Sequence, residues 1–209
     1  MDINAGGALY PSVHGVGVMG IGTVADSLAA VEKVVYNDHV CTLSQLCDAL
    51  RANFEGWDDL RQLLLAAPKY GNNQDFVDKY AAWFVEFQSN LFKPYRTRDG
   101  GGLYIAIASN TANIDAGAEV AATPDGRLNS EPLSDAASPM HGMDRRGPTA
   151  ALLSLCKPDY TLAACGTVVN QKYSPEMLLD ADKRTKMVCL VMTYFQKGGQ
   201  ELQINSVSR

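Results

Sequence analysis

Hydrophobic positions recur every three or four residues over much of the first hundred residues, and this period predicts helices. The predicted helices cover 23–35, 42–56, 57–67 and 73–92. Thr23 is the expected N-cap of the first helix, and Thr42 and Gln45 have the spacing of a capping box. The last helix carries one aromatic and apolar stripe, typical of a face that packs on a core: Phe76, Tyr80, Trp83, Phe87 and Leu91.

The pattern changes near residue 100. GGLYIAIASNT (101–111) is a short apolar run bounded by glycines, which predicts a strand buried on both faces. Frequent Gly, Pro, Asp and Ser predict turns and loops over 113–147, and Pro148 is placed to open a helix to about residue 157. Further elements are expected at 166–172 (strand), 174–175 (helical turn), 182–197 (helix, apolar nearly all round) and 200–204 (strand), whereas the glycine-rich stretch 1–22 is expected to be irregular.

Composition indicates an ordinary globular protein, with 46% hydrophobic and 20% charged residues. The net charge is −5 and no run of basic residues is present, so nucleic acid is not an expected partner. The sequence lacks a signal peptide and any apolar run of the roughly 18 residues that a membrane helix needs. Five cysteines without a CxxC pair fit a reducing compartment, so we expect a cytoplasmic protein; Cys156, Cys165 and Cys189 are expected in the core.

Most motifs that could carry chemistry are weak. GVGVMG (15–20) satisfies G-x-G-x-x-G, but Pro11 interrupts the strand that a dinucleotide fold needs directly before it. The three histidines lie far apart, and no group of His, Cys or carboxylates has a metal-ligand spacing, so no metal is expected. ATPDGR (122–127) has the chemistry of a turn, and it and GPTA (147–150) are interpreted as structural loops, which Arg127 and Asp144 can tie through charge-assisted hydrogen bonds.

Several such segments in one order are more specific than any one of them. In sequence order the chain contains ADSLAA, ALRANFEG, APKYGN, ATPDGR, EPLSDAASP, HGMDRRGPTA, GTVVNQKYSP and YFQKGGQELQIN. This succession resembles the glycyl radical enzymes, the pyruvate formate-lyase-like superfamily, over essentially all 209 residues. The resemblance implies an α/β fold in which residues 1–209 form part of a ten-stranded barrel, with 1–100 mainly helical and 101–209 made of strands, loops and helices.

The resemblance also implies a radical mechanism. In this family an activating enzyme, which uses S-adenosylmethionine and an iron–sulfur cluster, installs a radical on a glycine. That radical oxidises a cysteine to a thiyl, which abstracts hydrogen from a small substrate. The expected partners are therefore the substrate, the activating enzyme and a second copy in a homodimer. The branch is left open: formate acetyltransferase-like, dehydratase, decarboxylase or C–N lyase.

The two radical motifs of the family, a GCxE-like motif and an RVxGYSA-like loop, do not occur in these residues. The sequence therefore assigns no catalytic residue and no bound cofactor to the chain, and it predicts a segment of a longer lyase that lacks the glycyl radical domain. Alternatives are a non-catalytic subunit of a split barrel or a degenerate, inactive product.

The strand from Leu103, with its continuation to Gly117, matches the part of the family barrel that lines the cavity. Ser109, Thr111 and Asn113 would alternate onto one face of such a strand, where polar groups suit a small oxygen-bearing substrate. They are the predicted substrate-binding residues, with the opposite parity, Asn110 and Ala112, as the alternative. His14 is a further candidate for approaching the cavity.

Overall fold

The computed structural model describes residues 13–206, and the structural statements below concern these residues. The part of the predicted irregular stretch that falls on residues 1–12 lies outside them. Over residues 13–22 the prediction is wrong, because a strand (14–18) and the start of a helix (from residue 21) lie there. The helices are α1 (Ile21–Ala30), α2 (Leu43–Arg51), α3 (Asp58–Ala66), α4 (Asp75–Phe92), α5 (Ala112–Glu119), α6 (Pro148–Leu155), α7 (Glu176–Leu179) and α8 (Ala181–Gln196). The strands are β1 (His14–Val18), β2 (Leu103–Ile107), β3 (Asn170–Tyr173) and β4 (Gln203–Ser206).

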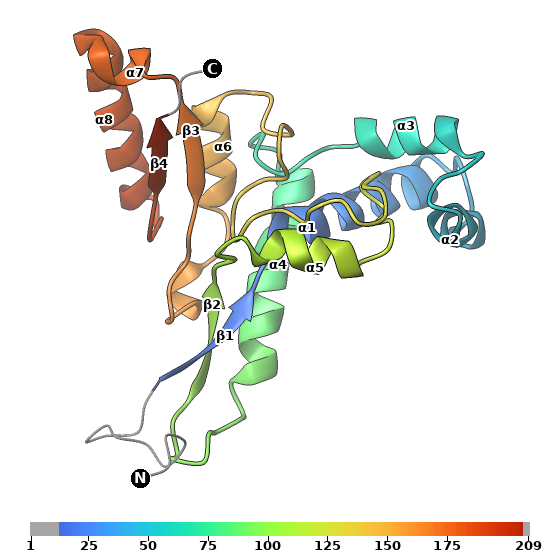
Figure 1. Cartoon of the computed structure of the whole chain (residues 1–209), viewed down its shortest axis with the longest axis horizontal. Coiled ribbons are helices and arrows are strands. Elements are labelled where there is room, and N and C mark those ends of the chain that lie inside the picture. Colours follow the sequence, from blue (N-terminus) through green and yellow to red (C-terminus); the bar gives the residue numbers. More distant parts are fainter. Residues whose placement is uncertain (1–12, 207–209) are drawn as a thin grey trace.

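The strands form two parallel pairs. β1 pairs with β2 in a register that joins His14 to Leu103, and β3 pairs with β4 in a register that joins Asn170 to Gln203. A single parallel bridge between Ile107 and Thr167 links the pairs, so β3 begins where β2 ends (Figure 1). The mixed α/β class is confirmed by these elements, whereas the ten-stranded barrel stays a prediction.

Helices support the strands. α4 contacts β2 and packs against α1, and α6 contacts α8 (Figure 1). The main core joins these elements through fully buried side chains, among them Ile21, Val77, Ile105, Leu155 and Val169. A second apolar cluster lies where a π-helical turn (Val31–Asn37) continues α1 toward α2 and α3.

Local chemistry explains where the first helices begin and end. Gly20, at φ 79°, is the N-cap of α1 and lies three residues before Thr23, so the prediction of Thr23 as the N-cap is wrong. The capping box of α2 is confirmed: Thr42 Oγ1 accepts from Gln45 N at 3.2 Å, and Gln45 Oε1 accepts from Thr42 N at 2.8 Å. That helix stops at residue 51 rather than 56, because the next turns place Asn53 and Phe54 at positive φ.

Only the first part of the aromatic stripe of α4 packs against the core. Phe76 and Tyr80 pack against the main core, but Trp83, Phe87 and Leu91 are 45–48% exposed. The apolar surface of α8 is likewise only partly covered, since Val188, Met192 and Phe195 are 46–55% exposed.

The region after β2 differs most from the expectation. The strand ends at Ile107 instead of running to 111 and on to 117, and Tyr104 is 43% exposed, so it is not buried on both faces. Asn110 and Thr111, with φ of 46° and 72°, turn the chain into α5, which occupies part of the predicted loop region 113–147. The helix from Pro148 is confirmed, with Gly147 as its N-cap.

Candidate functional site

A polar cluster lies where the end of β2 meets the start of β3. The Asp135 carboxylate joins the two strands, because Ser109 Oγ donates to its Oδ1 and Asn170 Nδ2 donates to its Oδ2. Ser109 is buried, and Asp135 and Asn170 are half-buried. Asn205 of β4 extends the cluster, since its Nδ2 lies 3.4 Å from Asn170 Oδ1. We define Ser109, Asp135 and Asn170 as the strand-end cluster.

The three predicted substrate-binding residues do not share one strand face, because the strand ends before them. Ser109 belongs to the strand-end cluster. Thr111 is exposed at the N-cap of α5. Asn113 instead holds the loop before Asp135: its Nδ2 donates to Leu133 O and its carbonyl accepts from Leu133 N, both at 3.0 Å. The alternation of 109, 111 and 113 is thus wrong as geometry, while substrate contact by these residues stays a prediction.

The loop that carries Asp135 is fixed from two further sides. Ser134 and Thr23 of α1 exchange two hydrogen bonds, from Thr23 N to Ser134 Oγ at 3.0 Å and from Ser134 N to Thr23 Oγ1 at 2.9 Å. On the strand side, Asn170 N donates to Ser138 Oγ at 2.9 Å. A carboxylate on a loop anchored at both ends has a defined position, which is what a recognition site needs.

This arrangement is suited to recognise hydroxyl groups. Both carboxylate oxygens of Asp135 already accept one hydrogen bond each, which fixes the orientation of the Ser109 hydroxyl and the Asn170 amide. Each carboxylate oxygen retains a second lone pair, and the Ser109 hydroxyl oxygen can itself accept. A small molecule with one or two hydroxyl groups could therefore both donate and accept here.

Buried ionisable groups lie behind the site, in the helical layer. Asp26 is fully buried, Tyr70 N donates to its Oδ1 at 2.6 Å, and burial raises the pKa of its carboxyl to about 8 against the opposing charge of Lys69. Burial likewise lowers the pKa of Lys69, whose Nζ donates to Leu64 O at 2.8 Å and Asp125 O at 3.1 Å. Among the described residues, the hydrogen bonds of Asp26 and Lys69 go to Tyr70, Leu64 and Asp125 and not to the strand-end cluster.

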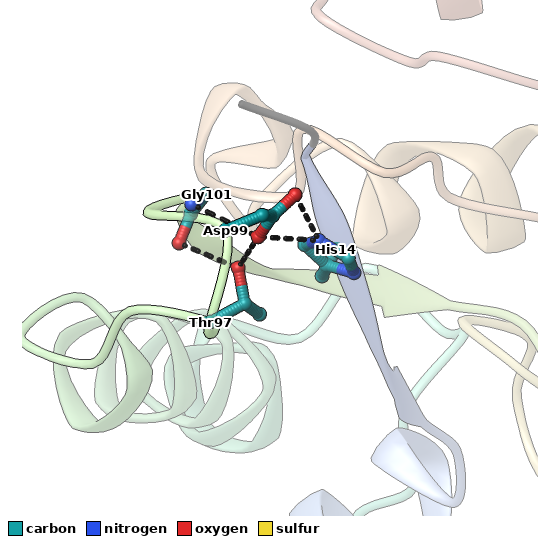
Figure 2. A network of polar contacts seen from close by, with 4 residues as sticks. All are labelled: His14, Thr97, Asp99 and Gly101. Carbon is teal, nitrogen blue, oxygen red and sulfur yellow. Dashed lines mark hydrogen bonds and ion pairs between the residues drawn. The ribbon is translucent and has the colours of Figure 1, made fainter. Parts of the chain in front are cut away.

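His14 lies at the opposite end of the β1–β2 pair. Figure 2 shows its ring beside the Asp99 carboxylate, with Nε2 3.4 Å from both oxygens, while Thr97 Oγ1 also donates to Asp99. The five-residue ladder places this pair roughly 13–16 Å from the end of β2 that leads to Ser109. The structure thus does not bring His14 to the strand-end cluster.

The ATPDGR loop is closed by Arg127. Its buried guanidinium donates to the carbonyls of Val120, Ala121 and Glu131 and to Thr123 Oγ1, all within its own loop. These contacts support the structural interpretation of the loop. Within the described ranges, no ion pair involves Asp144.

The structure also bears on the GVGVMG motif, on metal binding and on the cysteines. Gly15 and Gly17 lie within β1 rather than in a loop after it, so GVGVMG does not have the placement of a dinucleotide fingerprint. Over residues 13–206, no three His, Cys or acidic side chains gather in a way that could hold a metal ion. Cys189 is exposed, so its predicted core position is wrong, and Cys156 and Cys165 are half-buried. None of the helices described is long and apolar enough to cross a membrane.

Comparison with known families decides the chain's affiliation. Residues 1–117 match the family model described as pyruvate formate lyase-like, and residues 133–209 match the model described as glycine radical. The chain belongs to the glycyl radical enzymes. Residues 133–209 thus match the glycine radical model although the sequence predicts a chain without that domain, while the RVxGYSA-like motif does not occur in the 209 residues.

Similar glycyl radical enzymes act on small molecules. The chain is 38% identical to the probable dehydratase YbiW of Escherichia coli K12, with 100% of the chain and 27% of the relative covered. It is 36% identical to the isethionate sulfite-lyase of Bilophila wadsworthia (91% and 23% covered). The glycerol-bound B12-independent glycerol dehydratase of Clostridium butyricum superposes with a TM-score of 0.94 at 34% identity (98% and 26% covered). The chain thus spans about a quarter of these relatives.

Sequence reasoning missed Asp135 and Asn170. Both lie in segments that carry the family resemblance, EPLSDAASP and GTVVNQKYSP, but neither segment has a hydrophobic period that predicts where a side chain points. Their proximity arises from long-range pairing of the loop with β3.

Proposed function

We propose that this chain supplies part of the substrate site of a glycyl radical lyase that cleaves a bond in a small hydroxylated molecule. The strand-end cluster carries the proposal, because a fixed Ser–Asp–Asn group offers both donors and acceptors to a hydroxyl. The relatives support the substrate class, since their names include a glycerol dehydratase and an isethionate sulfite-lyase.

The role of the cluster in this proposal is recognition and orientation. The Ser109 hydroxyl and the free lone pairs of Asp135 hold the substrate hydroxyl, and Asn170 keeps the carboxylate in place. The glycyl radical, installed by an activating enzyme that uses S-adenosylmethionine and an iron–sulfur cluster, supplies the hydrogen-abstraction chemistry. No step of that chemistry is assigned to residues 1–209, because the GCxE-like and RVxGYSA-like motifs are not among them. A cytoplasmic homodimer is part of the same proposal.

The test is anaerobic kinetics on the full protein that carries this sequence, after activation and with the glycyl radical verified by electron paramagnetic resonance. Glycerol and isethionate serve as substrates. Ser109→Ala removes a hydrogen bond to a charged group, so KM should rise roughly tenfold. Ser44→Ala, an exposed position on α2, is the control and should leave KM unchanged.

The same assay distinguishes the three predicted substrate-binding residues. Asn113→Ala should raise KM less than Ser109→Ala, since Asn113 acts through the loop, and Thr111→Ala should have the smallest effect. Absence of turnover with the radical present would refute the proposed function. Equal KM values for Ser109→Ala and the unaltered protein would remove the strand-end cluster from the substrate site.

A further inference from the structure

A cation lies on the same face of β3 as Asn170. Along this strand Gln171 and Tyr173 are buried, whereas Asn170 and Lys172 point to the other face, as the period of two requires. Two residues along a strand separate the α-carbons of Asn170 and Lys172 by roughly 6.5 Å. Lys172 is exposed and pairs in register with Asn205, which itself contacts Asn170. The face is therefore continuous with the strand-end cluster.

A second basic side chain meets this lysine. Lys172 Nζ lies 3.4 Å from His141 Nε2, so the imidazole accepts a hydrogen bond from the ammonium group. His141 belongs to a tight turn closed by Met143 N donating to Met140 O at 3.0 Å. Arg145 follows on that turn, with its Nε 3.4 Å from Gly142 O and an Nη 3.5 Å from Met143 Sδ.

These cations have no counter-ion within the part of the chain that the structure describes. Neither Lys172 nor Arg145 has a carboxylate oxygen within 4.0 Å, although the turn contains Asp144 and the chain's net charge is −5. Ammonium and guanidinium groups that have no carboxylate partner favour the binding of an anion.

We propose that Lys172, with His141, binds an anionic group of the substrate, a sulfonate or a carboxylate. This inference rests on the proposed function, because it places the substrate hydroxyl at the strand-end cluster and the anionic group about two residues further along β3. A two- or three-carbon hydroxylated acid has the matching length. The Asp135 carboxylate repels the anionic end, so the orientation of the substrate is set by both charges.

The first test compares two substrates in the activated full protein. In Lys172→Met, KM for isethionate should rise at least tenfold, because a charge-assisted contact is lost, while KM for glycerol should stay unchanged. Lys172→Arg keeps the charge and should retain most of the affinity for isethionate. Lys186→Met removes the same charge from an exposed site on α8 and is the matched control.

The second test needs no turnover. Titration of the same proteins with sodium sulfate in a calorimeter should show binding that Lys172→Met abolishes and Lys186→Met leaves intact. If Lys172→Met loses sulfate binding but keeps the isethionate KM of the unaltered protein, the site is overturned as a substrate site. If Lys172→Met keeps both sulfate binding and the isethionate KM, the anion site is overturned altogether. Normal glycerol turnover in Lys172→Met would leave the proposed function intact even when the anion site fails. Failure of the anion site is thus distinguishable from failure of the proposed function.

Discussion

Gly117 is the point at which α5 touches the loop that leads to Asp135. A β-carbon at this position would lie 2.3 Å from Glu131 O and 2.7 Å from Pro132 Cα, and Glu131 O also accepts from the Arg127 guanidinium. Gly117→Ala must therefore displace backbone on one side or the other. We expect this displacement to move the loop and to weaken the Arg127 contact.

The magnitude follows from two opposing effects. Alanine gains up to about 1 kcal/mol over glycine in a helix interior. Inserting a methyl group into a packed contact costs about 1–3 kcal/mol, and the upper end applies because the atoms it meets are backbone. The net loss of unfolding free energy should be about 2 kcal/mol, which corresponds to a Tm lower by about 4–8 °C for a chain of this size.

Thermal and urea unfolding of the purified protein measure this loss, and a parallel rise in KM would report the movement of Asp135. Gly17→Ala is the control, because no atom lies within 4 Å of its future β-carbon and β1 is extended there. The reasoning is refuted if Gly117→Ala is as stable as the unaltered protein, or if Gly17→Ala loses as much.

Two further predictions concern buried charge. Arg127→Met leaves several carbonyls of its loop without a donor, so the free energy of unfolding in urea should fall by about 3 kcal/mol. The control is Arg51→Met, at an exposed ion pair, which should change that free energy by less than about 0.5 kcal/mol. Equal losses in the two variants would contradict the prediction. Because the pKa of Asp26 is raised from 3.8 to about 8 in the fold, its stabilisation is complete below pH 4 and is lost as pH rises toward 8. Between pH 6 and 8, above the pKa of about 6 for Asp78, Asp26→Asn should abolish a slope of up to about 1.4 kcal/mol per pH unit, and an unchanged slope would refute the assignment.

The helices of the first hundred residues could be predicted because their signals are local. The capping box of Thr42 and Gln45, for example, depends on residues only three positions apart. The exposure of Trp83 and Phe87 could not be predicted, because a stripe of apolar residues shows which face they share and not what covers it.

The second half was harder to predict because its chain reversals depend on single residues. ANIDAGAE forms α5 although its Asn, Asp and Gly favour turns, since Gly117 permits the close approach to Glu131. The turn at Asn110 and Thr111 ends β2 early, and this moved the predicted substrate residues off the strand. Ser109 still lies at the strand-end cluster because it follows the last residue of β2 by only two positions.

The order in which the strands pair has a consequence for how the chain folds. His14 of β1 must find Leu103 of β2 roughly 90 residues later, whereas β3 and β4 are separated by roughly 30 residues. Closing the longer loop costs more entropy before any ladder bond is gained, and the α1–α4 contact bridges most of that distance. In pulse-labelling hydrogen exchange, amides of β3 and β4 should therefore gain protection before those of β1, and the strand-end cluster should be completed only when the two halves have joined.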